Sequence, residues 1–275
     1  MRVNKQQLVV AILSWALSVG AASATERYFA YTYEPEVFPQ GAAEFEQWVT
    51  WRGQRNDTVG QHNYSRWEFR EEFEYGVTDN YSVSFYLNTS ETTWRPVPAS
   101  GEKSPGFVFD GIAFENRYMV LNPAEHAVGL TLYLEPRFSG TEAELEEKII
   151  IGQRWGDWKW ALNLSHATEW ALNDHETEGE VEVNFGITRH LNKHWSAGIE
   201  VRDHNELPEY DQWENTALFV GPSVTYTADK WWATLSVLPQ VYGNNFQGNP
   251  DNNRGFELEG HERVNIRMVV GISFQ

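Results

Sequence analysis

The feature that most constrains the fold is the alternation of apolar and polar residues after the first 24 positions. Val181, Val183 and Phe185, for example, alternate with Glu182 and Asn184. A period of two places each residue type on its own face of a β-strand. Because no later stretch sustains apolar residues at helical spacing, we expect an all-β fold.

The alternation predicts about twelve strands, most of them near the roughly 9–11 residues that a tilted strand needs to cross a bilayer. They are expected at residues 43–52, 64–77, 81–93, 107–121, 127–138, 145–155, 158–172, 179–189, 195–202, 215–227, 231–242 and 261–274.

The connections between these strands alternate in length. Those after even-numbered strands are short, such as residues 78–80 and 156–157, whereas most others are longer and polar, such as residues 94–106 and 243–260. Short periplasmic turns and longer extracellular loops are typical of outer-membrane barrels. We therefore predict a single transmembrane antiparallel up-and-down β-barrel, with both termini on the periplasmic side.

Aromatic residues lie on the apolar face beside the short connections. Amphipathic rings favour the headgroup level of a bilayer, so this pattern predicts an aromatic girdle. A soluble β-sandwich would also show alternation, but has no reason to carry such a ring at one end. The predicted girdle comprises Tyr75, Tyr81, Trp155, Trp158, Trp195, Tyr226 and Trp231.

Composition excludes other classes of protein. An aromatic content of 15% is too high for a disordered chain, and a net charge of -18 argues against nucleic acid as a partner. Without cysteine, no disulfide or zinc-thiolate site can form. The eight histidines show neither HExxH spacing nor pairing, so we expect no metal site and no cofactor.

The amino-terminal residues predict export. Arg2 and Lys5 precede the apolar run 8–19, and Ala22-Ser23-Ala24 supplies small residues suited to signal peptidase. We expect a cleaved signal peptide at residues 1–24, a periplasmic segment at 25–42 and an outer-membrane barrel at 43–275. An uncleaved anchor is the alternative, but the run is short for a bilayer.

The last predicted strand ends almost at the carboxy terminus, with Met268, Val270, Ile272 and Phe274 on one face. It resembles the assembly signal of Gram-negative outer-membrane barrels, whose closing strand ends in an aromatic residue; here one residue, Gln275, follows Phe274. The resemblance implies that the barrel assembly machinery is a partner.

Two further stretches, residues 33–48 with the sequence YEPEVFPQGAAEFEQW and residues 74–83 with the sequence EYGVTDNYSV, resemble an uncharacterised family of single-domain barrels. That family carries only a domain-of-unknown-function label. The resemblance covers the mature chain and implies fold and location, with the lipid bilayer and lipopolysaccharide as surroundings.

The polar face of the strands would line the lumen. These side chains either pair with one another to brace the interior, or form facing charged rows in a narrow water-filled passage. The leading hypothesis is a passive channel or transporter for a small solute, and the alternative is a closed structural or surface-interaction barrel. The candidate lumen residues are Arg66, Glu68, Arg70, Glu72, Glu115, Arg117, Glu135, Arg137, Glu200 and Arg202.

A second alternative is a lipid hydrolase. Ser165, His166, Thr168 and Glu169 are similar to the Ser and His constellations of outer-membrane lipases and lipid A deacylases. Adjacent residues on a strand point to opposite faces, so Ser165 and His166 are not expected to pair. We therefore do not expect an enzyme.

Acidic residues concentrate in the expected extracellular loops. They are either simple solubilising charges or an acidic crown that binds divalent cations shared with lipopolysaccharide. The residues are Glu142, Glu144, Glu146, Glu147, Asp174, Glu176, Glu178, Asp203, Glu206, Glu209, Asp211 and Glu214.

Overall fold

The computed structural model describes residues 26–55, 61–96, 103–173, 175–208, 210, 212–247 and 255–274. The expected signal peptide, residues 1–24, lies outside the described residues. Within the described ranges, no helix is long and apolar enough to cross a membrane.

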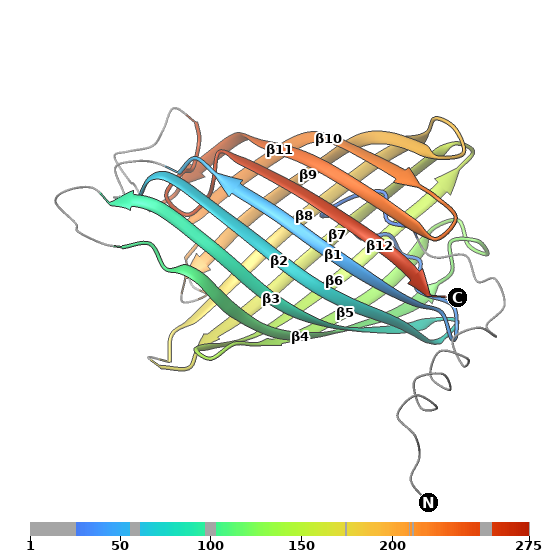
Figure 1. The fold of residues 1–275 in the computed structure, drawn as a ribbon, viewed down its shortest axis with the longest axis horizontal. Coiled ribbons are helices and arrows are strands. Elements are labelled where there is room, and N and C mark those ends of the chain that lie inside the picture. Colours follow the sequence, from blue (N-terminus) through green and yellow to red (C-terminus); the bar gives the residue numbers. More distant parts are fainter. Residues whose placement is uncertain are drawn as a thin grey trace, which may run out of the picture.

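Twelve antiparallel strands among the described residues form one closed barrel, so the predicted fold class is confirmed (Figure 1). Each strand pairs with its neighbours in sequence, and β1 pairs with β12 from Ala43 opposite Phe274 to Gly53 opposite Val264. The strands are β1 (Ala43–Gly53), β2 (Gln61–Thr78), β3 (Tyr81–Pro96), β4 (Gly106–Leu121), β5 (Gly129–Phe138), β6 (Glu142–Trp155), β7 (Trp158–Ala171), β8 (Thr177–His190), β9 (Trp195–Pro208), β10 (Asn215–Thr227), β11 (Trp231–Asn245) and β12 (Val264–Phe274).

The two ends of the barrel differ in their connections. One end, here called the turn side, carries the β2–β3, β4–β5, β6–β7, β8–β9 and β10–β11 connections and the start of β1. The opposite end, the loop side, carries the remaining connections, including residues 246–263 between β11 and β12. Several strands extend further toward the loop side than predicted: β6 begins at Glu142 and β9 continues to Pro208.

The outer surface of the barrel is apolar. Leu132, Leu164, Ile199 and Met268 are among the exposed large hydrophobic residues on its outward face. The seven residues of the predicted girdle all point outward near the turn side. The ring of Tyr226 contacts those of Trp195 and Trp231 there, with centroids 4.9 and 5.2 Å apart. Phe274 is also exposed, at the end of the closing strand.

The amino-terminal segment, residues 26–42, lies inside the barrel. The sequence predicts a periplasmic segment at residues 25–42, yet Phe29, Ala30 and Thr32 have no exposed surface. The segment lies in the turn-side half of the lumen and then joins β1 at the turn side (Figure 1). Its insertion explains how a barrel of twelve strands fills half of its interior.

Candidate functional site

The innermost part of the amino-terminal segment is bound by one carboxylate. Glu200 on β9 accepts hydrogen bonds from the backbone N–H groups of Ala30, Tyr31 and Thr32, at 3.2, 2.7 and 2.6 Å. The hydroxyl of Ser236 on β11 donates a further bond to Glu200 at 2.7 Å. A carboxylate that accepts four hydrogen bonds satisfies backbone N–H groups of the segment that pair with no strand.

Side chains from other strands bind the rest of the segment. Asn163 on β7 accepts from the Tyr33 N–H at 2.6 Å and donates to the Tyr33 carbonyl at 2.8 Å. The Thr131 hydroxyl donates to the carbonyl of Pro35 at 2.5 Å. Ser223 donates to the carbonyl of Tyr28 at 3.0 Å. Hydrogen bonds from several strands therefore hold the segment across the lumen.

Glycines on the inner wall make room for this segment. A Cβ atom at Gly186 on β8 would lie 2.5 Å from the ring of Phe29. At Gly129 and Gly152, a Cβ atom would lie 2.7 and 2.9 Å from side-chain carbons of Pro35. Contacts this short cannot exist, so these inward positions exclude any larger residue while the segment is in place.

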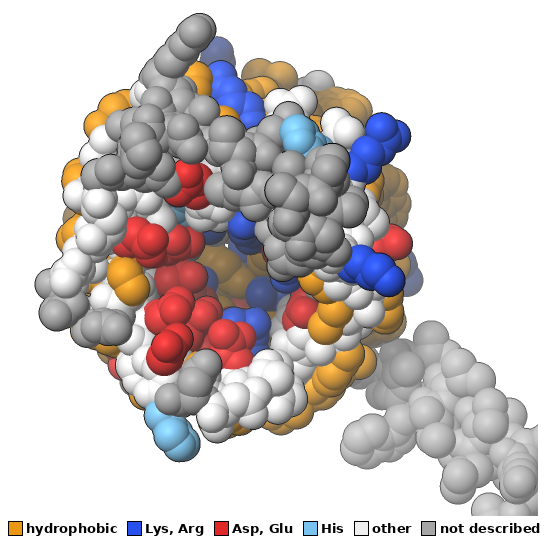
Figure 2. All heavy atoms as spheres, turned by 90° about the vertical axis from the view of Figure 1, so that its left-hand side faces the viewer, with side chains coloured by type: hydrophobic (Ala, Val, Ile, Leu, Met, Phe, Trp, Pro, Cys, Tyr) orange, Lys and Arg blue, Asp and Glu red, His pale blue; other side chains and the backbone are white. Residues whose placement is uncertain are grey.

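The segment divides the lumen into two cavities. The loop-side chamber has a volume of about 430 Å³, and the side chains of Tyr31 and Tyr33 form part of its floor. The turn-side cavity has a volume of about 390 Å³ and is lined by Arg27, Tyr28 and Glu34, among others. The loop-side chamber opens at the mouth that Figure 2 shows.

Charge is segregated across the loop-side chamber. The basic wall consists of Arg52 on β1, Arg66 and Arg70 on β2, and Arg267 on β12, and it includes one carboxylate, Glu68, which pairs with both Arg52 and Arg66 at 3.0 Å. The acidic wall lies about half a turn around the barrel, and acidic side chains gather on one side of the mouth in Figure 2. The acidic wall consists of Glu144 and Glu146 on β6, Glu169 on β7, and Glu180 and Glu182 on β8.

On the basic wall, two guanidinium groups have no carboxylate within ion-pair distance among the described residues. Arg70 donates to Asn88 at 3.2 Å, and Arg267 donates to Thr50 at 2.8 Å. Arg70 also lies over the ring of Tyr86 at 4.1 Å, and Arg267 over that of Tyr31 at 3.8 Å. Both cations are thus positioned by neutral partners and keep their charge available to the chamber.

The acidic wall contains more carboxylates than cations. Arg137 binds Glu144 and also Glu169, the latter at 3.3 Å. Lys148 binds Glu146 at 2.8 Å. Across the neighbouring strands, Arg202 pairs with Glu182 at 2.6 Å and His204 contacts Glu180 at 3.0 Å. One arginine shared by two glutamates leaves this wall with excess negative charge.

The structure places all ten candidate lumen residues in the interior, in three environments. Arg66, Glu68, Arg70, Glu135, Arg137 and Arg202 line the loop-side chamber, and Arg117 lines the turn-side cavity. Glu72, Glu115 and Glu200 are buried around the amino-terminal segment.

Their partners are not always the expected ones. Glu200 binds the segment instead of Arg202, which pairs with Glu182 on the next strand. Glu115 accepts from the Tyr33 hydroxyl at 3.3 Å, and Arg117 donates to the carbonyls of Glu34 and Glu36. Burial of residues 26–42 was not visible in the charge pattern, although the inward glycines could have indicated it.

The expected acidic crown has to be corrected. Glu144 and Glu206 belong to strands and line the chamber, because β6 and β9 extend further than predicted, and Glu146, which lies inside the predicted strand 145–155, lines the chamber too. Glu147 is exposed, as a surface charge would be. Asp174, Glu209 and Asp211 lie outside the described residues.

The residues considered for a hydrolase do not converge. Ser165 is buried and faces the lumen, whereas His166 faces outward and contacts the hydroxyl of Tyr210 at 3.3 Å. Thr168 also bonds with Tyr210, and Glu169 pairs with Arg137. Ser165 and His166 thus lie on opposite faces of β7, where neither can activate the other.

Two groups of potential metal ligands occur among the described residues. Glu72, Glu74 and Glu115 are buried carboxylates around the amino-terminal segment, and Arg117 pairs with Glu74 at 3.2 Å. The second group combines His204 and Glu206 on β9 with His261 from the β11–β12 connection. Sequence reasoning missed it because residues 206 and 261 are far apart in the chain.

The sequence pattern of a family of unknown function, DUF6662, matches residues 21–149 and 156–274. The chain belongs to this family. A comparison with curated proteins found no match.

Among solved structures, the fold is similar to the COG4313 outer-membrane channel of Pseudomonas putida F1, with a TM-score of 0.58 and 9% identity. The similarity covers 87% of this chain and 97% of the channel. The NanC porin is also similar, with a TM-score of 0.52, 10% identity, and coverage of 84% of this chain and 99% of the porin. At such low identity these similarities show the fold, which is that of outer-membrane β-barrels.

Proposed function

We propose that this protein is a passive outer-membrane channel for a small solute that carries both a positive and a negative group. The observation that supports this most directly is the loop-side chamber, where a basic wall from β12, β1 and β2 faces an acidic wall from β6 to β8. Opposed rows of charge create a transverse field that orients a dipolar solute and favours it over a neutral one.

The chamber has a suitable size for such a solute. Its volume of about 430 Å³ lies in the range of small-molecule pockets. Unpaired Arg70 and Arg267 can bind a carboxylate or another anionic group, and the carboxylates of the acidic wall can bind an ammonium group. Both charges of one solute would then be satisfied at the same time.

In this proposal residues 26–42 act as the gate. They separate the chamber from the turn-side cavity, and passage requires that the tip of the segment withdraw from Glu200 and Asn163. The segment enters and leaves at the turn side, so it can move without breaking the barrel. Hydrogen bonds to side chains, unlike strand pairing, can be replaced by water as the segment moves.

The proposed location follows from the fold and from the predicted signal peptide. Export would deliver the chain to the periplasm, where the barrel assembly machinery would recognise the closing strand that ends at Phe274. The aromatic girdle would then lie at the headgroup level of the periplasmic leaflet. The turn side would then face the periplasm and the loop side the exterior. Surface labelling of a cysteine at Gly140, in the β5–β6 connection, should succeed on intact cells and fail if the orientation is reversed.

Solute uptake into proteoliposomes tests the channel. We expect a small zwitterion to enter several times faster than a neutral solute of equal size, and the double variant Arg70→Ala/Arg267→Ala to lose this preference. Arg189→Ala is the matched control, because Arg189 is exposed away from the chamber and its loss should change nothing. Equal entry of both solutes into wild-type vesicles would contradict the proposal.

One observation favours a second candidate, a closed structural barrel. Glu200, Asn163, Thr131 and Ser223 all bind the segment, so a permanently filled turn-side half is also consistent with the geometry. A closed barrel would admit neither solute. Variants with weakened contacts to the segment would then conduct no more ions than the wild type.

A further inference from the structure

We propose that His204, Glu206 and His261 form a binding site for a divalent transition-metal cation of the Zn²⁺ type at the loop-side mouth of the chamber. Donor atoms of the three side chains all lie within 4.8 Å of one another. Imidazole and carboxylate groups are the ligands that Zn²⁺ and its neighbours prefer, whereas Ca²⁺ and Mg²⁺ favour oxygen alone. The inference is independent of whether the barrel conducts.

His204 is already arranged as a metal ligand. Its Nε2 lies 3.0 Å from a carboxylate oxygen of Glu180 and 3.9 Å from one of Glu182. Its Nδ1 is buried and has no hydrogen-bond partner among the described residues, and the whole residue is only 7% exposed. Metal-bound histidines commonly donate their second ring N–H to a carboxylate, which fixes the tautomer and makes the other nitrogen more basic.

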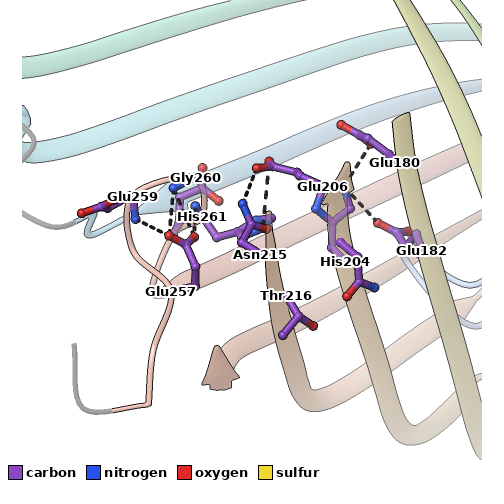
Figure 3. Close-up of polar contacts among 12 residues, drawn as sticks. Glu180, Glu182, His204, Glu206, Asn215, Thr216, Glu257, Glu259, Gly260 and His261 are labelled. Atoms are coloured by element: carbon purple, nitrogen blue, oxygen red, sulfur yellow. Dashed lines mark hydrogen bonds and ion pairs between the residues drawn. The ribbon is translucent and has the colours of Figure 1, made fainter. Parts of the chain in front are cut away.

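His261 approaches from the opposite side (Figure 3). Its ring stands nearly perpendicular to that of His204, with centroids 4.9 Å apart. Its Nε2 lies 4.0 Å from an oxygen of Glu206 and 2.9 Å from the side-chain oxygen of Asn215.

The turn that carries His261 is held in place by a carboxylate. Glu257 accepts the backbone N–H groups of Glu259, Gly260 and His261, the last at 2.9 Å. Gln240 on β11 binds the backbone of the same turn, at the N–H and carbonyl of Glu257. These contacts order the ligand before any cation arrives, which lowers the entropy lost on binding.

Asn215 completes the arrangement. Its amide nitrogen donates to Glu206 at 2.5 Å while its oxygen accepts from His261. When a cation binds at Nε2 of His261, the neutral ring takes the tautomer with its proton on Nδ1, and the oxygen of Asn215, which no longer accepts from Nε2, can become a fourth ligand. Ligands about 2.0–2.2 Å from Zn²⁺ are roughly 3.5 Å apart, so side-chain shifts of about 1 Å close the site.

A cation held here would join β9 to the connection between β11 and β12. Residues 255–263 would thereby be fixed against the rim of the chamber, because His261 belongs to this stretch. The site would therefore tie one side of the loop-side mouth to the barrel wall at β9.

Titration of the purified full chain with ZnCl₂ tests the site, using protein in detergent without a polyhistidine tag. We expect one Zn²⁺ per chain, with affinity reduced at least tenfold in His204→Gln and in His261→Asn. His126→Ala is the matched control, since His126 lies in the turn-side β4–β5 connection, and should bind as the wild type does. Absence of stoichiometric binding, or binding unchanged in both variants, would overturn the proposal.

Two further measurements keep the test decisive if a variant folds poorly. Co²⁺ bound to the wild type should give the intense visible absorption of a four- or five-coordinate site with nitrogen ligands, whereas weak octahedral bands would overturn the proposal. Glu180→Gln should lower Zn²⁺ affinity about 10- to 100-fold, because it weakens the orientation of His204 without removing a ligand. An unchanged affinity in Glu180→Gln would show that the Nδ1 of His204 is not the donor.

Discussion

The two halves of the lumen provide partners for their polar side chains in different ways. In the turn-side half, residues 26–42 fill the interior, and buried groups such as Glu200 and Asn163 find their partners on the segment. In the loop-side half, charged side chains face a chamber of about 430 Å³ and pair with one another only in part. Polar groups on the inner wall can therefore form hydrogen bonds either with a peptide segment or with solvent and solute. Only the arrangement with solvent and solute leaves space for a solute to pass.

The largest expected effect comes from removing the carboxylate that binds the segment. Glu200→Ala leaves three backbone N–H groups and the Ser236 hydroxyl without their acceptor. We expect a loss of about 4 kcal/mol or more in the free energy of unfolding, or release of the segment, since each of the four buried donors left unsatisfied costs about 1–3 kcal/mol. Urea unfolding in vesicles and limited proteolysis of the segment measure the two outcomes.

The matched change in the other half is Glu169→Ala. Glu169 is partly solvated, and its partner Arg137 retains Glu144, so the loss should stay below about 1 kcal/mol. If both variants lose the same stability, the two halves do not differ in the way described.

Glycine substitutions give the next largest effect. In Gly186→Ala, the new methyl group would lie 2.5 Å from the ring of Phe29, so either the ring or the segment must move. Overpacking of this kind costs about 1–3 kcal/mol. At Gly140, on the loop side, a Cβ meets nothing within 4 Å, and Gly140→Ala should change stability by less than about 0.5 kcal/mol. Thermal unfolding of both variants would sharpen the comparison, and a tolerant Gly186 would break it.

The smallest expected effect concerns ion selectivity. Neutralising the acidic wall with Glu144→Gln, Glu146→Gln and Glu169→Gln should lower the preference for cations over anions severalfold, as read from the reversal potential in a salt gradient. The difference from wild type should shrink at high salt, because the Debye length falls to about 3 Å at 1 M. Glu36→Gln is the control, because Glu36 lines the turn-side cavity, on the other side of the gate from the acidic wall. Anion selectivity in the wild type would rule out control by the acidic wall.

Much of the barrel could be predicted from the sequence because period-two alternation is a local signal. Strands such as β10, with Asn215 and Thr227 as its ends, match their predicted bounds, since lipid on one face enforces the alternation. In β9, residues 203–208, which extend toward the loop side, are mostly polar and the alternation ends, so the sequence pattern places Glu206 in a loop. In β6, glutamates at 142, 144 and 146 do alternate with Ala143 and Leu145, and it is the density of acidic residues that favours a loop there.

The interior was harder to predict than the barrel wall. That Arg66 and Glu200 point inward follows from parity, but the partner of each depends on strand register and on the path of residues 26–42. The alternation along β8 places Gly186 on the polar, inward face, yet only the structure shows that Phe29 packs against it. His204 and His261 meet through a long connection, for which no spacing rule exists.

The central claim is that residues 26–42 gate the channel, and a reversible crosslink tests it most directly. The chain contains no cysteine, and a Cβ at Gly186 lies 2.7 Å from the Cγ of Phe29, so Phe29→Cys/Gly186→Cys brings two sulfurs within disulfide reach. Planar-bilayer recordings of this double variant should be silent when it is oxidised and show conductance steps after reduction. Equal conductance in both states, or silence in both, would contradict the account.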